Sequence, residues 1–224
     1  MSKDYSIFDV VGPNMIGPSS SHTAGAARLG KMARKIVGSN IIDVKFYLHG
    51  SFAETYKGHG TDKSLVGGIL GFETDDVRIR DAFNIAKSEG LNFEFIKANL
   101  GDDCHPNTVK MYITLNDSNK FIVVGSSIGG GNIKITEIDG LKMNFDGSKF
   151  SMILELKNEP GSMASVISLL AENKKNIATI YSNAIANTNF SFVSIETDEK
   201  LEDDLIDAIK NSSVVDRIVV LDKF

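Results

Sequence analysis

The pattern of apolar and polar positions is clearest over residues 150–224, where short alternating runs are separated by turn residues. Alternation with a period of two predicts strands, which we place at 150–157, 177–184, 189–197 and 214–221. Apolar residues recur at helical spacing in residues 163–173, which Ser162 can cap, and in residues 201–211, which begin with acidic residues. The order strand, helix, strand, strand, helix, strand predicts a ferredoxin-like βαββαβ unit.

The first part of the chain is rich in glycine and mixes helical with strand periodicity. It opens with a short apolar segment at residues 5–10 and a loop at residues 12–23. Periodicity predicts helices at 24–37, 61–71 and 79–88, and strands at 41–49, 92–97, 107–115, 119–125 and 132–138. In the first strand, Ile42, Val44, Phe46 and Leu48 share one face.

Residues 139–148 contain two Asp-Gly turn signals, which indicate either a hairpin or a linker. We therefore expect an α+β chain with two domains, residues 1–147 and residues 148–224.

Composition narrows the classes of function. The net charge of −5 argues against a nucleic-acid binder that relies on a basic surface. No window approaches the roughly 18 apolar residues of a membrane span, and the N-terminus lacks the apolar core of a signal peptide. Cys104 is the one cysteine, so an intrachain disulfide and a multi-cysteine metal site are excluded. We expect a cytoplasmic protein without nucleic-acid or membrane partners.

The most unusual run is Gly17-Pro18-Ser19-Ser20-Ser21-His22-Thr23-Ala24-Gly25, which precedes a predicted helix. Backbone N–H groups at the start of a helix attract anions, and the hydroxyl groups of Ser and Thr add donors. A capped helix with a polar loop is the simpler explanation. Five consecutive side chains with donors exceed what a cap needs, which favours a site for a carboxylate or a phosphate.

A second polar run, from His49 to Asp62, begins where a predicted strand ends. Loops at strand ends often carry functional groups, because the sheet holds them in place. His59 and Asp62 are candidates for an acid/base or orienting pair. A glycine-rich loop with a hydrogen-bonded histidine explains the same residues, and the run alone does not separate the two.

Three further runs are weaker signals. Adjacent residues seldom face each other in an active site, so we expect Cys104 to be a buried or incidental thiol, with His105 and Asn107 at a polar site edge. The run Ser126–Asn132 contains three glycines but no nucleotide-binding motif, which favours a tight turn.

The turn Asn158-Glu159-Pro160-Gly161-Ser162-Met163 could hold a small polar ligand at a helix start, although taken alone it is an ordinary connection.

Taken together, these motifs resemble the iron–sulfur-dependent L-serine dehydratases, specifically the β chain of their two-subunit form. The resemblance rests on Gly17–Thr23, Gly50–Ala53 with Gly58–Asp62, His105–Asn107 and Ser127–Gly131, which match in order and spacing. It covers nearly the whole chain. Residues 148–224 resemble an ACT domain, in which Asn158, Glu159, Gly161, Ser162 and Met163 correspond to the ligand turn, and residues 1–147 resemble an allosteric substrate-binding lobe.

The resemblance implies that the protein converts L-serine to pyruvate and ammonia with a 4Fe-4S cluster held by a separate α chain. An open iron site would act as a Lewis acid for the substrate hydroxyl. A cluster needs about four thiolates, so this chain with its one cysteine is not the holder. As hypotheses, Ser19, Ser20, Ser21 and Thr23, with Asp62, bind the substrate, and His59, or secondly His22, transfers a proton or orients the substrate.

Assembly and regulation are open at this stage. We expect a homodimer through the ACT domain or an α2β2 complex, with L-serine as a ligand. The alternative function is a non-catalytic, serine-sensing regulatory subunit, since ACT and substrate-binding-like domains are typical of regulators.

Overall fold

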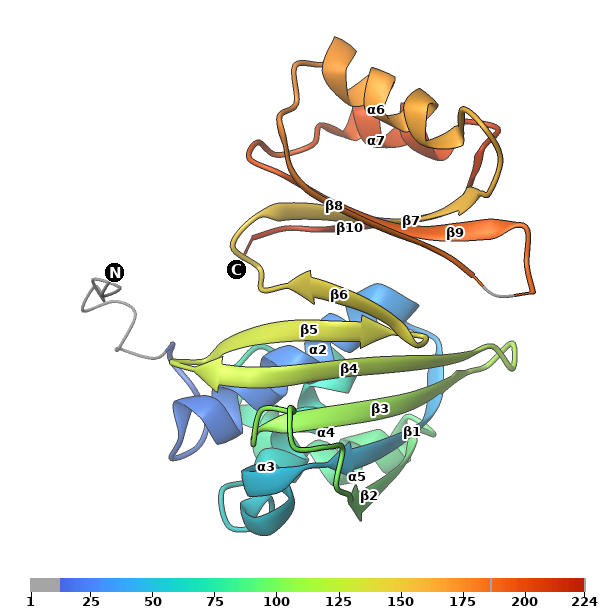
Figure 1. The fold of residues 1–224 in the computed structure, drawn as a ribbon. Helices are drawn as coiled ribbons and strands as arrows, with labels where there is room; N and C mark the ends of the chain where they lie inside the picture. The colour runs from blue at the N-terminus through green and yellow to red at the C-terminus, as the bar shows by residue number, and fades with distance from the viewer. Residues whose placement is uncertain (1–12, 186, 224) are drawn as a thin grey trace. The chain divides into compact units, whose positions relative to one another are not determined.

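The computed structural model describes residues 13–185 and 187–223, with helices and sheets in both parts of the chain, which confirms the α+β class (Figure 1). The chain forms two compact units that divide between Asn144 and Phe145, three residues before the boundary expected from the sequence. The apolar segment expected at residues 5–10 lies outside the described residues.

The first unit is built on a mixed six-stranded sheet with the order β2-β1-β3-β4-β5-β6. Its strands are β1 (Ile41–Leu48), β2 (Asn92–Lys97), β3 (Thr108–Leu115), β4 (Lys120–Gly129), β5 (Asn132–Ile138) and β6 (Leu141–Phe145). Strands β1 and β2 are parallel, and β1 to β5 are otherwise joined by antiparallel pairs. Asp139 and Gly140 join β5 to its sheet neighbour β6 at positive φ angles of 50° and 82°, so the first Asp-Gly signal is a hairpin turn. The second, Asp146-Gly147, lies in the connection from β6 to β7.

Helices pack against one face of this sheet. They are the wide helical turn η1 (Ser20–Ala24), α2 (Gly25–Val37), α3 (Gly50–Thr55), α4 (Thr61–Leu70), the 3₁₀ turn η2 (Val77–Asp81) and α5 (Ala82–Ser88). Helix α2 contacts β4 and crosses α4 closely. At the crossing, a Cβ atom on Gly30 would lie 2.3 Å from the Leu65 carbonyl oxygen, and one on Gly68 would lie 2.1 Å from that of Ala27. Only glycine therefore allows the two helix backbones to approach this far.

The structure corrects four details of the sequence reading in this unit. The loop expected at residues 12–23 becomes helical from Ser20, and the loop expected after β1 begins with α3. The helix expected at 79–88 starts at Ala82, because a 3₁₀ turn precedes it. Ile42 is 41% exposed rather than buried with Val44, because an irregularity between Ile41 and Asp43 breaks the alternation of faces.

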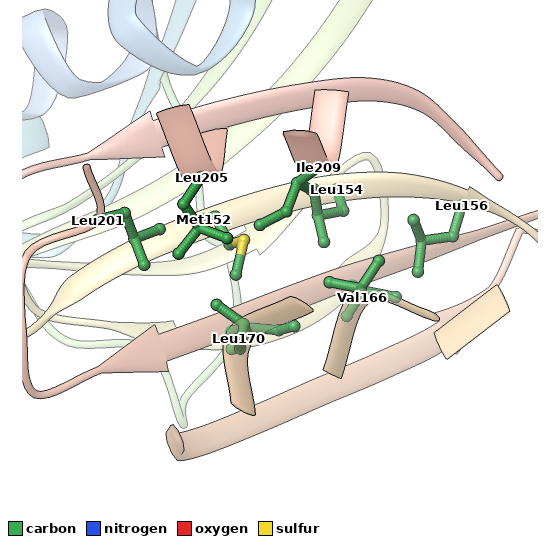
Figure 2. Packing of buried hydrophobic residues seen from close by; sticks show 10 residues of the cluster. Met152, Leu154, Leu156, Val166, Leu170, Leu201, Leu205 and Ile209 are labelled. Atoms are coloured by element: carbon green, nitrogen blue, oxygen red, sulfur yellow. The ribbon is translucent and has the colours of Figure 1, made fainter. Parts of the chain in front are cut away.

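The second unit has the predicted βαββαβ order. Its elements are β7 (Phe150–Lys157), α6 (Ser162–Glu172), β8 (Ile177–Ala184), β9 (Phe190–Thr197), α7 (Asp203–Lys210) and β10 (Val215–Leu221). The antiparallel sheet has the order β10-β7-β9-β8, and both helices cover the same face (Figure 1). Figure 2 shows the core between them, where Met152, Leu154 and Leu156 of β7 meet leucines, isoleucine and valine of the two helices.

One prediction in this unit is wrong. Ser162 does not cap α6, because Gly161 occupies the cap position in the left-handed conformation, with φ of 94°. That conformation suits glycine, and it places Ser162 in the first helical turn, where its hydroxyl is buried. In neither unit does the described part of the chain contain a helix long and apolar enough to cross a membrane.

Candidate functional site

The serine-rich run forms the turn that leads into α2. Ser19 is extended, and its hydroxyl oxygen accepts a hydrogen bond from the His22 backbone N–H at 3.1 Å. Gly17 has φ of 143° and lies so close to Thr23 that a Cβ atom there would be 2.4 Å from its methyl group. The turn is therefore held by a cap at one end and by a close backbone approach at the other.

His22 lies between two hydroxyl groups. Its Nε2 is 3.0 Å from the Oγ of Ser51, which is 29 residues away in sequence, and its Nδ1 is 3.5 Å from the Oγ of Ser19. Burial lowers the pKa of His22, as does the neighbouring His59, whereas a hydrogen bond to the Ser51 backbone raises it. The net direction is downward from 6.5, so the neutral ring is favoured near neutral pH.

His59 lies against His22, with their ring centroids 5.0 Å apart. The hydroxyl of Thr23 donates to the carbonyl oxygen of His59 at 3.4 Å and so ties the two loops together. The Nδ1 of His59 is buried and has no hydrogen-bond partner among the described residues. A buried polar atom without a partner is costly and calls for an explanation, among which are a catalytic role and a bound water or ion.

A hollow of about 380 Å³ borders His59 and Asp62. Gly17 and three cationic side chains, those of Lys57, Lys63 and Arg80, also line it. Asp62 lies in the first turn of α4, and its carboxylate accepts from the Lys63 backbone N–H at 2.8 Å. Burial raises the pKa of the Asp62 carboxyl, although that bond and the nearby lysines oppose the shift. The hollow therefore joins a proton-transfer candidate to groups that attract an anion.

A larger hollow of about 640 Å³ lies where β1 and β2 end, bordered by His49, Lys97 and Cys104 among others. The Nδ1 of His49 accepts from the Leu100 backbone N–H at 3.1 Å. The thiol of Cys104 is half-buried and donates to the Leu100 carbonyl oxygen at 3.2 Å. The thiol bond is local to the loop after β2, and His49 bonds to that loop from the end of β1. Neither bond joins Cys104 to a histidine as an activated nucleophile requires.

The run with three glycines is the tight turn that the sequence predicted. Gly129, Gly130 and Gly131 all have positive φ, and they join β4 to β5. The buried hydroxyl of Ser127, just before them, lies under η1, so closely that a Cβ atom on Gly25 would be 2.0 Å from it. Asn107 reaches the same place, because its side-chain amide donates to the Ser127 carbonyl oxygen at 3.5 Å.

The turn in the second unit has only local or backbone bonds. The Asn158 N–H donates to the Asn189 carbonyl oxygen at 2.7 Å, and the Ser162 N–H donates to that of Glu159 at 3.2 Å. Residues 158–161 are exposed, Ser162 is buried and Met163 packs partly against the core. The expected ligand turn is thus formed, and its ligand stays a prediction.

The structure brings together Ser19, His22, Thr23, His59 and Asp62, the N-terminal site residues predicted from the sequence, while Ser20 and Ser21 lie half-buried in η1. It adds Ser51, Lys57, Lys63 and Arg80, which the sequence reading did not assign. Ser51 follows a strand end, which is a usable signal. No sequence signal distinguishes the three cations from other surface charges.

The donor set does not fit an iron–sulfur cluster. Within residues 13–185 and 187–223, no group of three or more His, Cys, Asp and Glu side chains is placed to hold a metal ion. The whole sequence contains one cysteine, whereas a 4Fe-4S cluster takes about four thiolates.

Comparison with known proteins identifies the family. The profile of the serine dehydratase beta chain family matches residues 6–137. The L-serine dehydratase beta chain of Peptoniphilus asaccharolyticus is 47% identical over 206 residues, which are 92% of this chain and 93% of that protein. The probable L-serine dehydratase beta chain of Bacillus subtilis is 39% identical over 91% of this chain and 92% of its own length.

A more distant similarity extends to another enzyme. The D-3-phosphoglycerate dehydrogenase of Bacillus subtilis is 22% identical over 88% of this chain, which corresponds to 37% of that protein. The family profile covers more than half of the chain, and the beta chains cover nearly all of it. This chain therefore belongs to the serine dehydratase beta chain family.

Proposed function

We propose that this chain works as the β subunit of an L-serine dehydratase, a lyase that converts L-serine to pyruvate and ammonia together with a separate α subunit. Membership of the beta chain family supports the activity and the need for a partner. The main support for placing the active site here is that the buried Nδ1 of His59 has no hydrogen-bond partner among the described residues and that His59 borders a hollow with three cationic side chains.

The residues of this chain account for two requirements of the reaction. The substrate carboxylate needs donors, which the hydroxyls of Ser20 and Ser21 supply in η1. Ser19, also predicted to bind the substrate, has its hydroxyl next to His22 Nδ1 and supports the turn instead. A proton must leave Cα, and His59 is the better placed of the two histidines, because both ring nitrogens of His22 already face protein hydroxyls. Thr23 acts differently from the serines, since its buried hydroxyl holds the His59 loop. Asp62 borders the same hollow and is proposed to bind the substrate there.

The 4Fe-4S cluster is proposed to belong to the α subunit, because this chain lacks the ligands for it. We derive no step through the cluster from this chain. The corresponding expectation is that the isolated chain neither binds a cluster nor dehydrates serine, and anaerobic iron loading of the chain alone tests this.

The second unit is proposed to pair with its copy, in a homodimer or an α2β2 complex, and to bind L-serine at Asn158–Met163. The edge strand β8 supports pairing, because Ile180 and Tyr181 on it are exposed and its outer edge has no neighbouring strand in the four-stranded sheet. Gly161 at the start of α6 supports a ligand, since it leaves the helix N–H groups open to a close approach. Calorimetry of the full chain with millimolar L-serine, with Gly161→Val as the comparison, tests the ligand.

A purely regulatory chain is the competing function. We expect His59→Gln to lower kcat of the reconstituted two-chain enzyme by about 10²- to 10⁴-fold, as for a general acid–base group. Ser20→Ala should mainly raise KM for L-serine. Ser88→Ala is the control, because its hydroxyl donates only to the Ile85 carbonyl oxygen at the end of α5. If His59→Gln changes the serine dependence and leaves the maximal rate intact, the chain is a regulator and the catalytic proposal fails.

A further inference from the structure

Ser51 occupies a rigid position beside the candidate site. It lies in the first turn of α3, directly after β1, and Thr55 one turn later donates to its carbonyl oxygen at 2.8 Å. The neighbouring Gly50 has φ of 54°, and a Cβ atom there would lie 2.7 Å from the Pro106 carbonyl oxygen, which accepts from the Phe52 N–H. The sheet and the Pro106 loop therefore fix the backbone that carries the Ser51 hydroxyl.

The hydroxyl of Ser19 favours one tautomer of His22. Ser19 Oγ accepts from the His22 backbone N–H and has a proton of its own to donate, and the Nδ1 of the same residue lies 3.5 Å away. A neutral imidazole has one N–H group and one acceptor nitrogen. We assign Nδ1 as the acceptor, which leaves the proton on Nε2, 3.0 Å from Ser51 Oγ.

The faces of the ring are also occupied. Phe52 meets His22 in an edge contact with centroids 5.3 Å apart, and His59 lies at 5.0 Å. Because bonds to Ser19 and Ser51 fix the plane of the ring while Phe52 and His59 limit its tilt, His22 has one position in the structure. Two neighbouring imidazoles repel each other when both are charged, so a neutral His22 lets His59 accept a proton without that cost.

We propose that Ser51 is a positioning residue: by accepting a hydrogen bond from His22 Nε2 it fixes the ring plane and the tautomer of His22, and His22 in turn holds the ring of His59. This inference rests on the proposed function, because Ser51 reaches the reaction only through the two histidines. In the structure the Ser51 hydroxyl hydrogen-bonds to His22, and Ser51 is not among the described residues that line the hollow beside His59 and Asp62.

The experiment compares Ser51→Ala, Ser51→Thr and the matched control Thr55→Val in the two-chain enzyme. Ser51→Ala removes the acceptor and should lower kcat by about 10- to 100-fold with little change in KM, as expected for a misplaced catalytic group. Ser51→Thr keeps a hydroxyl and should restore most of kcat. Thr55→Val removes the hydroxyl that bonds to the Ser51 carbonyl oxygen but leaves the Ser51 hydroxyl and the contact of Gly50 with Pro106 in place, so it should leave kcat within about two-fold.

A second measurement does not depend on activity. Nitrogen-15 spectra of the histidine rings in the full-length chain should show His22 as the Nε2–H tautomer, and Ser51→Ala should shift or broaden its signals, whereas Thr55→Val should not. The Nδ1–H tautomer in the wild type, or unchanged His22 signals and unchanged kcat in Ser51→Ala, would overturn the inference. If the wild-type complex lacks dehydratase activity, the proposed function fails, and the ring spectra still decide whether Ser51 positions His22.

Discussion

Two turns in this chain lead from a loop into a helix, and they differ in what surrounds them. In the first unit, the turn at Ser19–Thr23 bonds to Ser51 and to His59, which are 29 and 36 residues away from their partners. In the second unit, the turn at Asn158–Met163 is largely exposed, and its hydrogen bonds among the described residues run to backbone carbonyl oxygens. Both contain glycine and serine before an apolar stripe, so the sequence makes them look alike.

The comparison shows why similar turns carry different amounts of chemistry. A capping serine needs one N–H partner, and both turns satisfy their own backbone. Among the described residues, the first turn has other elements packed over it that bring a second histidine and a hollow with cationic side chains beside it, whereas residues 158–161 of the second turn are exposed. Burial among distant residues, rather than the local motif, is what shifts the pKa of His22 and leaves a nitrogen of His59 without a partner.

The largest effect is expected from disrupting the crossing of α2 and α4, which supports the first turn. Gly68→Val places side-chain atoms against the Ala27 carbonyl oxygen, where even a Cβ atom would lie at 2.1 Å. We expect a loss of about 3 kcal/mol in the unfolding free energy of the first unit, since an overpacked core cannot absorb the atoms. Urea unfolding, followed separately by amide signals of each unit, measures this loss. A variant with wild-type stability would show that α2 and α4 do not pack as described.

The next effect compares a hydroxyl from each turn. Thr23→Val removes a buried donor and leaves the His59 carbonyl oxygen without that bond, which should cost about 1–2 kcal/mol of stability. Ser165→Ala removes an exposed hydroxyl that donates to Gly161 within the same helical turn, and it should change stability by less than about 0.5 kcal/mol. Thermal unfolding of both variants measures the difference. Equal costs would mean that the two turns are energetically alike, contrary to the comparison.

A smaller effect appears in the pH dependence of stability. The pKa of His22 is lowered in the folded chain, first by burial and then by His59, from an unfolded value of 6.5. Below about pH 6.5 the unfolded chain therefore binds a proton that the folded chain resists, so stability falls as the pH drops from 6.5 toward the lowered folded pKa. His22→Gln should flatten this part of the curve. Urea unfolding between pH 5.5 and 7.5, on the order of one unit either side of the unfolded pKa of 6.5, tests this prediction. If stability depends on pH equally steeply in His22→Gln and in the wild type, His22 is not the group responsible.

The smallest effect is expected at Cys104. Its thiol bonds to the Leu100 carbonyl oxygen, and a serine hydroxyl can make the same bond. Cys104→Ser should leave the kcat of the two-chain enzyme within about two-fold. A loss of about 10³-fold, on the scale of a catalytic group, would make the thiol part of the chemistry.

Much of the fold follows from the sequence by local rules. In the second unit, periodicity and turn residues predict all six elements, because each strand and helix buries one face against the same core. The exceptions occur at positions where one local preference outweighs another or where the sequence pattern is absent. Gly161 rather than Ser162 occupies the cap position of α6, because the backbone there is left-handed, a conformation that only glycine adopts easily. The sequence does not predict the helix α3, because its six residues, Gly50–Thr55, carry no apolar stripe.

The candidate site, like the fold, follows partly from the sequence and partly from the packing of the chain. The sequence by itself determined which residues are candidates for the chemistry, since Ser19–Thr23, His59 and Asp62 stand out by residue type, and it determined that one cysteine cannot hold a cluster. The tertiary structure decided which of these side chains meet. The pairing of β1 with β3 and the crossing of α2 with α4 bring Ser51, His22 and His59 together across gaps of tens of residues. Hydrogen bonds and pKa shifts depend on distances of a few ångströms, and only the packed chain sets those distances.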